Sequence, residues 1–166
     1  MLATDRELQA AADTLGDLLI RQGLTIATAE SCTGGWVAKA LTDRAGSSAY
    51  LMAGLVTYSN EAKQAILGVE GPVLEQHGAV SESVVRQMVA GAIDTAGVDV
   101  AVAISGVAGP GGGSAEKPVG TVWFAWGTGS AETETSVQCF EGGRDAVRRQ
   151  AVLYVLQQVT RFLEQR

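Results

Sequence analysis

The chain has 166 residues, enough for one domain with a sizeable core, so we expect a single domain over residues 1–166. Hydrophobic residues make up 46% and charged residues 18% of the sequence, a globular balance that excludes intrinsic disorder. The formal net charge of −6 lacks the basic excess by which proteins bind nucleic acid or an anionic membrane. We therefore expect neither as a partner.

The N-terminal segment and the cysteines indicate the cellular compartment. Residues 1–13 are polar and acidic and lack the basic-then-apolar layout of a signal peptide. No apolar run approaches the ~20 residues that span a bilayer. Two cysteines, Cys32 and Cys139, are too few for a disulfide framework. We expect a soluble cytoplasmic protein with reduced thiols.

Hydrophobic periodicity predicts the elements of the first half of the chain. Apolar residues at helical spacing predict an amphipathic helix that ends at Gly23. Gly54 interrupts a predicted strand and marks either a bulge or a close backbone approach. In chain order we predict a helix (5–22), a strand (24–29), a helix (35–45) ending at Gly46, a strand (49–59) and a helix (60–68) stopping at Gly68.

The second half begins with one helical turn that Gly78 caps. It continues with a helix (81–97), a buried strand (98–105), a glycine-rich loop (106–120), two strands (121–128 and 132–140) and a long helix (144–165). A short turn joins the last two strands, so they are antiparallel neighbours. Five strands among helices predict an α/β layered domain with a mixed sheet.

Several catalytic classes lose support because their residues are missing. The only histidine, His77, is expected near the end of a helical turn, so a Ser-His-Asp triad would depend on that one residue. No His, Cys, Asp and Glu cluster has metal-ligand spacing, so we predict no metal. The glycine-rich loop matches neither the Walker nor the dinucleotide fingerprint. We expect no cofactor.

Ser31 lies between a predicted strand and a predicted helix, in the stretch "IATAESCTGGWV" (26–37). Ligands of open α/β sheets bind at this carboxyl edge. The backbone N–H groups of Cys32, Thr33 and Gly34 would be unpaired donors at the helix start, able to stabilise an oxyanion. Ser31 is therefore either a nucleophile or a helix N-cap, and the stretch alone leaves both open.

A serine nucleophile needs a base, and Lys63 is the candidate. It falls in the first turn of a predicted helix, where the macrodipole disfavours a cation and lowers the pKa of the amine. Tyr58 precedes that helix and is near enough to donate a proton. The alternatives are a solvated lysine and a tyrosine at a strand end. Cys32 is an alternative nucleophile, because a thiol beside a helix start can ionise.

Anion-binding candidates occur in three places. The glycine-rich loop from Gly106 can form nests of backbone N–H groups, although it is equally a flexible connection. Gly46, Ser47 and Ser48 form a small-residue turn. Arg144 can pair with a phosphate or carboxylate.

Five blocks of sequence resemble the CinA C-terminal domain family, whose stand-alone members act as nicotinamide mononucleotide deamidases. The blocks are "TAESCTGGWVAKALTDRAGSSAY" (28–50), "GLVTYSNEAK" (54–63), "GAVSE" (78–82), "AISGVAGPGGGSAEKPVGTVWFA" (103–125) and "RDAVRRQA" (144–151). The similarity runs from about residue 5 to the end of the chain.

The resemblance implies hydrolysis of the nicotinamide mononucleotide carboxamide to nicotinate mononucleotide and ammonia, in pyridine nucleotide recycling. It implies Ser31 as nucleophile, assisted by Lys63 and Tyr58, in a three-layer α/β/α fold with a mixed five-stranded sheet, without metal and as a homodimer. Larger relatives carry a pyrophosphatase domain for which this chain is too short, so we do not expect that activity. We expect the substrate contacts at Cys32, Thr33, Gly34, Gly46, Ser47, Ser48, Gly106 and Arg144.

Two other functions remain open at this point. The first is a nucleotide-binding module without efficient catalysis, for which a base beside a hydroxyl has no use. The second is a thiol hydrolase that uses Cys32.

Overall fold

The computed structural model describes residues 3–166 and contains one five-stranded sheet. The strand order is β2-β1-β3-β4-β5. β2, β1 and β3 are parallel, whereas β4 and β5 are antiparallel. The predicted mixed sheet is therefore confirmed. The strands are β1 (Ile26–Glu30), β2 (Leu51–Val56), β3 (Val100–Gly106), β4 (Thr121–Gly127) and β5 (Thr133–Cys139).

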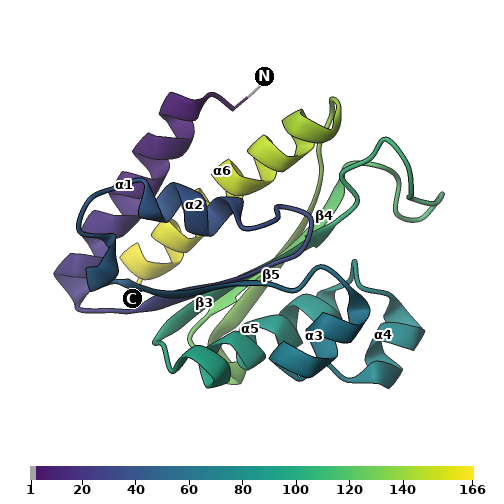
Figure 1. Ribbon diagram of the computed structural model, residues 1–166, viewed down its shortest axis with the longest axis horizontal. Helices are drawn as coiled ribbons and strands as arrows, with labels where there is room; N and C mark the ends of the chain where they lie inside the picture. Colours follow the sequence, from purple (N-terminus) through teal and green to yellow (C-terminus); the bar gives the residue numbers. More distant parts are fainter. Residues whose placement is uncertain (1–2) are drawn as a thin grey trace.

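Helices cover both faces of the sheet, which confirms the three-layer α/β/α fold (Figure 1). One face carries α1 (Asp5–Gln22), α2 (Trp36–Thr42) and α6 (Arg144–Glu164). The other carries α3 (Asn60–Leu67), α4 (Gly71–His77) and α5 (Glu82–Ala96). Short 3₁₀ turns precede β2 (Ser47–Ala49) and β5 (Ser130–Glu132).

The core is divided between these two faces. Ile104 and Phe124 belong to the cluster under α1, α2 and α6, and Ala103 and Ala125 to the cluster under α5. Successive residues of a strand point to opposite faces, so β3 and β4 supply both clusters. Every residue of β1 is buried, because this strand lies between two others and under both helical layers.

Local sequence explains most helix ends. Thr4 forms a capping box with Glu7 at the start of α1, and Gly23 ends that helix in the left-handed conformation (φ 67°). The predicted bounds of α1 are confirmed. Ser59 caps α3 by accepting a hydrogen bond from the Ala62 N–H.

The structure corrects the prediction for residues 31–45. α2 begins at Trp36, and its N-cap is Gly35 with φ 97°. Ser31 lies five residues earlier in a turn, so the interpretation of Ser31 as the N-cap of this helix is wrong. Ser31 is too far from α2 to cap it, because a turn of residues 31–34 lies between the end of β1 and the N-cap Gly35.

Gly54 marks a close backbone approach. A Cβ at this position would lie 2.7 Å from the Cβ of Ala38 on α2, so a glycine lets that helix pack onto β2. The irregularity in strand pairing is elsewhere, between Ile26 and Ala27 of β1. Close packing fixes α2 over the carboxyl ends of β1 and β2.

Candidate active site

Ser31 lies directly after β1, at the carboxyl edge of the parallel strands. Its N–H donates to the Ile104 carbonyl (3.0 Å) and extends the pairing of β1 with β3, and its carbonyl accepts from the Gly34 N–H (3.0 Å). The side chain is buried, and its Oγ lies 2.9 Å from the Nζ of Lys63. Strand and turn together direct this hydroxyl at the amine.

Lys63 reaches this position from the first turn of α3. Only 1% of the residue is exposed, and its Nζ also donates to the carbonyls of Thr57 (2.7 Å) and Tyr58 (3.3 Å). Within residues 3–166, no carboxylate forms an ion pair with it. Burial lowers the pKa of the Lys63 amine below its ordinary value of 10.5.

The neutral amine has the geometry of a general base. A neutral amine has two N–H bonds and one lone pair. When the two N–H bonds point at the carbonyls of Thr57 and Tyr58, the lone pair faces the hydroxyl of Ser31. A lowered pKa and a hydroxyl within hydrogen-bond distance are what an activated serine nucleophile requires.

Two side chains, the buried Glu30 and the half-buried Arg148, hold the turn that carries Ser31. Glu30 is fully buried, and its carboxylate accepts from the hydroxyls of Thr28 (3.1 Å) and Thr33 (2.7 Å) and from the N–H groups of Val37 (2.9 Å) and Ala38 (3.0 Å). It therefore compensates the unpaired donors at the start of α2.

From the other side, Arg148 of α6 donates to the carbonyls of Cys32 (3.0 Å) and Thr33 (3.3 Å). The C=O and N–H of a trans peptide point in opposite directions, so the Thr33 N–H points away from Arg148. Within residues 3–166, the N–H groups of Cys32 and Thr33 have no hydrogen-bond acceptor. Neither N–H is therefore used within the described part of the protein, and Cys32 lines the cavity beside Ser31 whereas Thr33 does not.

Cys32 is a poor nucleophile in this position. Burial raises the pKa of its thiol to about 11, so the thiolate is scarce at neutral pH. Its side chain packs in the apolar cluster under α1, α2 and α6. This chemistry disfavours the thiol-hydrolase alternative.

A cavity of about 310 Å³ opens beside Ser31 and Lys63. Arg144 is its only permanently charged lining residue, and no carboxylate lines it among the described residues. The guanidinium donates to the Gly109 carbonyl (2.8 Å) and to the Tyr58 hydroxyl (3.1 Å). The other lining residues are Cys32, Asn60, Ala79, Val80, Ser105, Gly106, Val107, Ala108, Gly111, Gly112 and Gly113.

The glycine-rich loop forms one wall of this cavity. In the described part of the chain, the N–H groups of Gly111, Gly112 and Gly113 donate to no other group. Gly112 and Gly113 have φ near 80°, in the left-handed region that side chains disfavour. Free N–H groups in such a loop suit an anion, and with Arg144 they give the cavity a positive potential.

The structure brings some predicted site residues together and separates others. Ser31, Cys32, Tyr58, Lys63, Gly106 and Arg144 line the cavity. Thr33 and Gly34 belong to the same turn but line a neighbouring hollow with Trp36 and Arg148. Gly46, Ser47 and Ser48 precede β2 and therefore lie at the opposite edge of the sheet from Ser31 within this chain.

Sequence reasoning missed three contributors. Ser105 is a buried serine at the end of β3, and a polar residue at the carboxyl end of a strand was the available signal. Glu30 and Arg148 act on the turn through contacts that no local pattern encodes. His77 ends α4, where its carbonyl accepts from Lys117 (2.6 Å), and it does not line the cavity.

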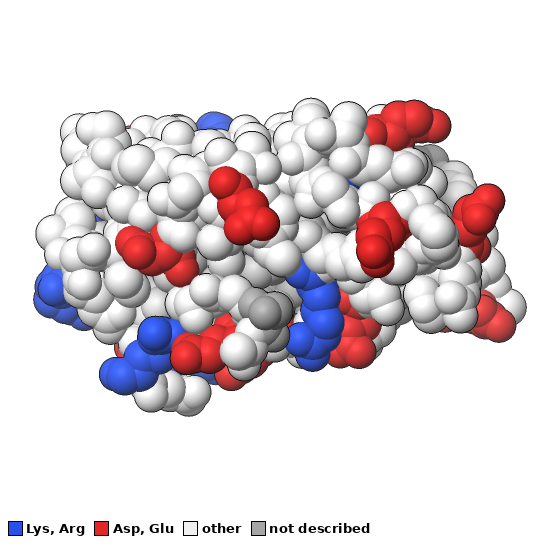
Figure 2. All heavy atoms as spheres, turned by 90° about the horizontal axis from the view of Figure 1, so that it is seen from below, with Lys and Arg blue, Asp and Glu red and all other residues white. Residues whose placement is uncertain are grey.

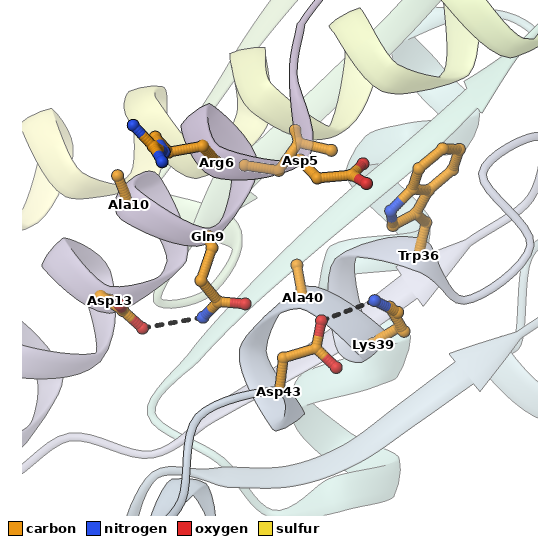
Figure 3. Close-up of a pocket in the computed structure, with 10 residues that line it drawn as sticks. Asp5, Arg6, Gln9, Ala10, Asp13, Trp36, Lys39, Ala40 and Asp43 are labelled. Carbon is orange, nitrogen blue, oxygen red and sulfur yellow. Dashed lines mark hydrogen bonds and ion pairs between the residues drawn. The ribbon is translucent and has the colours of Figure 1, made fainter.

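A larger hollow of about 560 Å³ separates α1 from α2 (Figure 3). Its polar side chains bond one another: Gln9 donates to Asp13 (2.8 Å), and Lys39 pairs with Asp43 (2.6 Å). None of its residues places a nucleophile beside a base. We interpret this hollow as a packing groove between α1 and α2, without a catalytic role.

Two further observations concern metals and membranes. Within residues 3–166, no group of three or more His, Cys, Asp or Glu side chains is placed to hold a metal ion. In the same range, no helix combines the length and hydropathy needed to span a bilayer.

Comparison with known proteins identifies the family. The sequence-family model described as the CinA C-terminal domain matches residues 8–163 of this chain. The chain belongs to this family. Its relatives include the nicotinamide-nucleotide amidohydrolase PncC of Escherichia coli K12, which is 59% identical over 154 residues and 93% of each chain. The PncC of Pseudomonas putida is 54% identical over 87% of this chain and 90% of its own.

Solved structures of the CinA family have the same fold. A superfamily protein from Klebsiella pneumoniae gives a TM-score of 0.92 at 41% identity, over 96% of this chain and 99% of that one. A competence/damage-inducible protein from Agrobacterium tumefaciens gives 0.91 at 39% identity, over 98% of both chains. The resemblance seen in the sequence is therefore confirmed over nearly the whole chain.

Proposed function

We propose that this protein is an amidohydrolase that converts nicotinamide mononucleotide to nicotinate mononucleotide and ammonia. The names of the PncC relatives give the substrate. The observation that carries the chemistry is the 2.9 Å contact between the Ser31 hydroxyl and the buried amine of Lys63. An amide is an acyl compound, and a serine activated by a neutral amine suits acyl transfer.

The first chemical step forms an acyl-enzyme. Lys63 takes the proton of the Ser31 hydroxyl while Oγ bonds to the carboxamide carbon. The oxyanion is held by the free N–H groups of Cys32 and Thr33. The C–N bond then breaks, its electron pair stays on nitrogen, and the Lys63 ammonium returns the proton, so ammonia leaves.

The second step reverses these roles with water. Lys63 takes a proton from water, whose oxygen attacks the ester carbon of the acyl-enzyme. Collapse of this intermediate breaks the bond to Ser31 Oγ, which recovers its proton from Lys63. Nicotinate mononucleotide is released, and the enzyme returns to its starting state.

Tyr58 and Arg144 act on the substrate at the cavity mouth. The Tyr58 hydroxyl accepts a hydrogen bond from Arg144, so its own O–H is free to donate to the substrate or the leaving ammonia. Arg144 and the loop N–H groups hold the phosphate, because the cavity lining offers no other fixed positive charge in the described residues.

The role in pyridine nucleotide recycling, the cytoplasmic location and the homodimer belong to the same proposal. In support of a dimer, the edge strand β2 exposes Met52 (46%) and Val56 (45%), and an exposed apolar edge favours pairing with another chain. Light scattering of the purified protein tests this state. A monomer at micromolar concentration would reject the dimer.

Ammonia release from nicotinamide mononucleotide tests the function. Ser31→Ala and Lys63→Ala should abolish it while the circular dichroism spectrum stays native. Lys39→Ala, at an exposed lysine of α2, is the matched control and should keep full activity. Release should be the same with a chelator and with added divalent metal. A Ser31→Ala variant as active as wild type would reject the nucleophile.

The binding-module alternative predicts a different result. Calorimetry would then show nicotinamide mononucleotide bound to the wild-type protein without release of ammonia.

A further inference from the structure

Ser105 is a second buried serine beside the proposed nucleophile. β1 and β3 are parallel with Glu30 opposite Ile104, and the Ser31 N–H continues this ladder to the Ile104 carbonyl. Ser105 therefore follows Ile104 as Ser31 follows Glu30, on the same face of the sheet. Neighbouring strands lie about 4.8 Å apart. The two hydroxyl-bearing residues are neighbours at the cavity floor.

The hydroxyl of Ser105 has no partner in the protein. The residue is 1% exposed and lines the cavity, yet within residues 3–166 its Oγ makes no hydrogen bond. An unpaired hydroxyl at a cavity wall is thus available to a bound molecule.

The carboxamide of the proposed substrate has two polar ends, and the cavity treats them differently. Its oxygen becomes an anion during attack and needs donors, which the Cys32 and Thr33 N–H groups supply. Its nitrogen keeps two hydrogens throughout the attack, and its lone pair becomes basic once the carbon is tetrahedral. A hydroxyl oxygen suits both states, because it can accept from an N–H while the lone pair stays open to Lys63.

We propose that Ser105 is a further catalytic residue, whose hydroxyl binds the carboxamide nitrogen and orients it for departure; this rests on the proposed amidohydrolase function. Before attack, Ser105 Oγ accepts from the amide N–H. After attack, Ser105 Oγ still accepts from an N–H of that nitrogen and so turns the nitrogen lone pair toward Lys63. The ammonium of Lys63 supplies the proton, the C–N bond breaks, and Ser105 keeps its own proton.

Two substrates separate this role from a merely structural one. With nicotinamide mononucleotide, Ser105→Ala should lower kcat/KM by about 10²-fold, the effect of losing one aimed hydrogen bond. With the methyl ester of nicotinate mononucleotide the loss should be small. An alkoxide leaves more readily than an amide nitrogen and depends less on assistance. Ser105→Thr, which keeps the hydroxyl, should restore amide hydrolysis.

Ser136→Ala is the matched control. It removes a hydroxyl from β5 of the same sheet, where Ser136 bonds the hydroxyl of Tyr154 (2.6 Å) away from the cavity. It should leave kcat/KM unchanged for both substrates.

Other outcomes would overturn the inference. Equal losses on amide and ester would show that Ser105 acts through the structure of the site. Unchanged amide hydrolysis in Ser105→Ala would exclude the contact altogether. A wild-type protein that hydrolyses the ester but releases no ammonia would instead refute the proposed function, and the role of Ser105 with it.

Discussion

Lys63 is a buried amine held by carbonyls and a hydroxyl, without a carboxylate partner among the described residues. A nearby carboxylate would stabilise the ammonium and raise its pKa, which would remove the base. Here desolvation by burial is the larger influence and lowers the pKa of Lys63, against a smaller opposing effect of the Cys32 thiol. Burying this amine therefore costs folding stability. In return, the Lys63 amine is deprotonated at a lower pH than the amine of a solvated lysine.

The activity of the enzyme should follow the deprotonation of Lys63. We expect kcat/KM for ammonia release to rise with pH, with the midpoint of the acid limb below the ordinary lysine value of 10.5. Initial rates between pH 5 and 10 measure this midpoint. Activity that is independent of pH over this range would contradict a lysine base.

The same group should affect stability with a defined sign. The unfolded chain binds the lysine proton more tightly than the folded protein, so stability rises with pH between the folded pKa and 10.5. Lys63→Met removes this dependence. In urea unfolding, the free energy of unfolding of the wild type should increase relative to that of Lys63→Met as pH rises through this window. Parallel pH profiles of the two proteins would contradict the shift.

Glu30 should position the turn of Ser31 without touching the substrate. Glu30→Gln replaces one acceptor oxygen by a donor and leaves buried donors unpaired, at a cost of about 1–3 kcal/mol. We expect a lower melting temperature and a lower kcat with little change in KM, because the turn that aims Ser31 loosens. Glu61→Gln, the same change at an exposed carboxylate of α3, should alter neither. A Glu30→Gln variant that loses stability but keeps full kcat would show that Glu30 stabilises the fold without positioning Ser31.

At the scale of elements, the sequence predicted helix and strand bounds well where the residues at those bounds determine them. Thr4 and Gly23 set the bounds of α1, and a run of apolar residues identifies the buried strand β3. For α2 the predicted start at residue 35 was right to within one residue, but the predicted end at residue 45 was wrong, since the helix ends at Thr42. Ser31 as its N-cap was also wrong, because Gly35 in the left-handed conformation takes that position. That geometry depends on Glu30 and Arg148, which act across elements and leave no local pattern.

The site divides in the same way. The contact of Ser31 with Lys63 was predictable, since the two residues follow β1 and β2 and these strands pair in parallel; their catalytic roles stay a proposal. The position of Ser105 beside Ser31 could not be predicted, because it depends on the register in which β3 pairs with β1. The predicted contacts at Gly46, Ser47 and Ser48 lie at the other edge of the sheet within one chain and stay a prediction.

Helix packing carries Lys63 to Ser31. α3 rests on α5 at Gly91, where a Cβ would lie 1.9 Å from the Leu67 carbonyl oxygen. Gly91→Ala must therefore push α3 outward and move Lys63 with it. We expect lower stability and a kcat reduced at least about tenfold, because small displacements of reacting groups are costly. Asp94→Ala, on the exposed side of α5, is the control and should preserve both. Full kcat in Gly91→Ala would show that α3 adapts without moving the amine.

Over the whole molecule, charge is distributed unevenly between surface and cavity. The net charge is −6, whereas Arg144 gives the cavity the opposite sign. The described part of the face in Figure 2, the side of α3, α4 and α5, carries scattered charges and no continuous basic patch. On the proposed function, the anionic nucleotide is repelled by the net charge at long range and attracted by Arg144 at short range.

This arrangement predicts an unusual response to salt. Nicotinamide mononucleotide is net anionic, since its phosphate outweighs its pyridinium charge. Raising ionic strength shortens the Debye length from about 30 Å at 0.01 M to about 10 Å at 0.1 M, which screens the long-range repulsion more than a direct contact of the phosphate with Arg144 at hydrogen-bond distance. We expect kcat/KM to rise modestly over this range. The riboside, which lacks the phosphate, serves as the control and should not gain. A fall in kcat/KM for the nucleotide alone would mean that attraction toward the cavity already dominates at long range, and that the surface charge does not govern its approach.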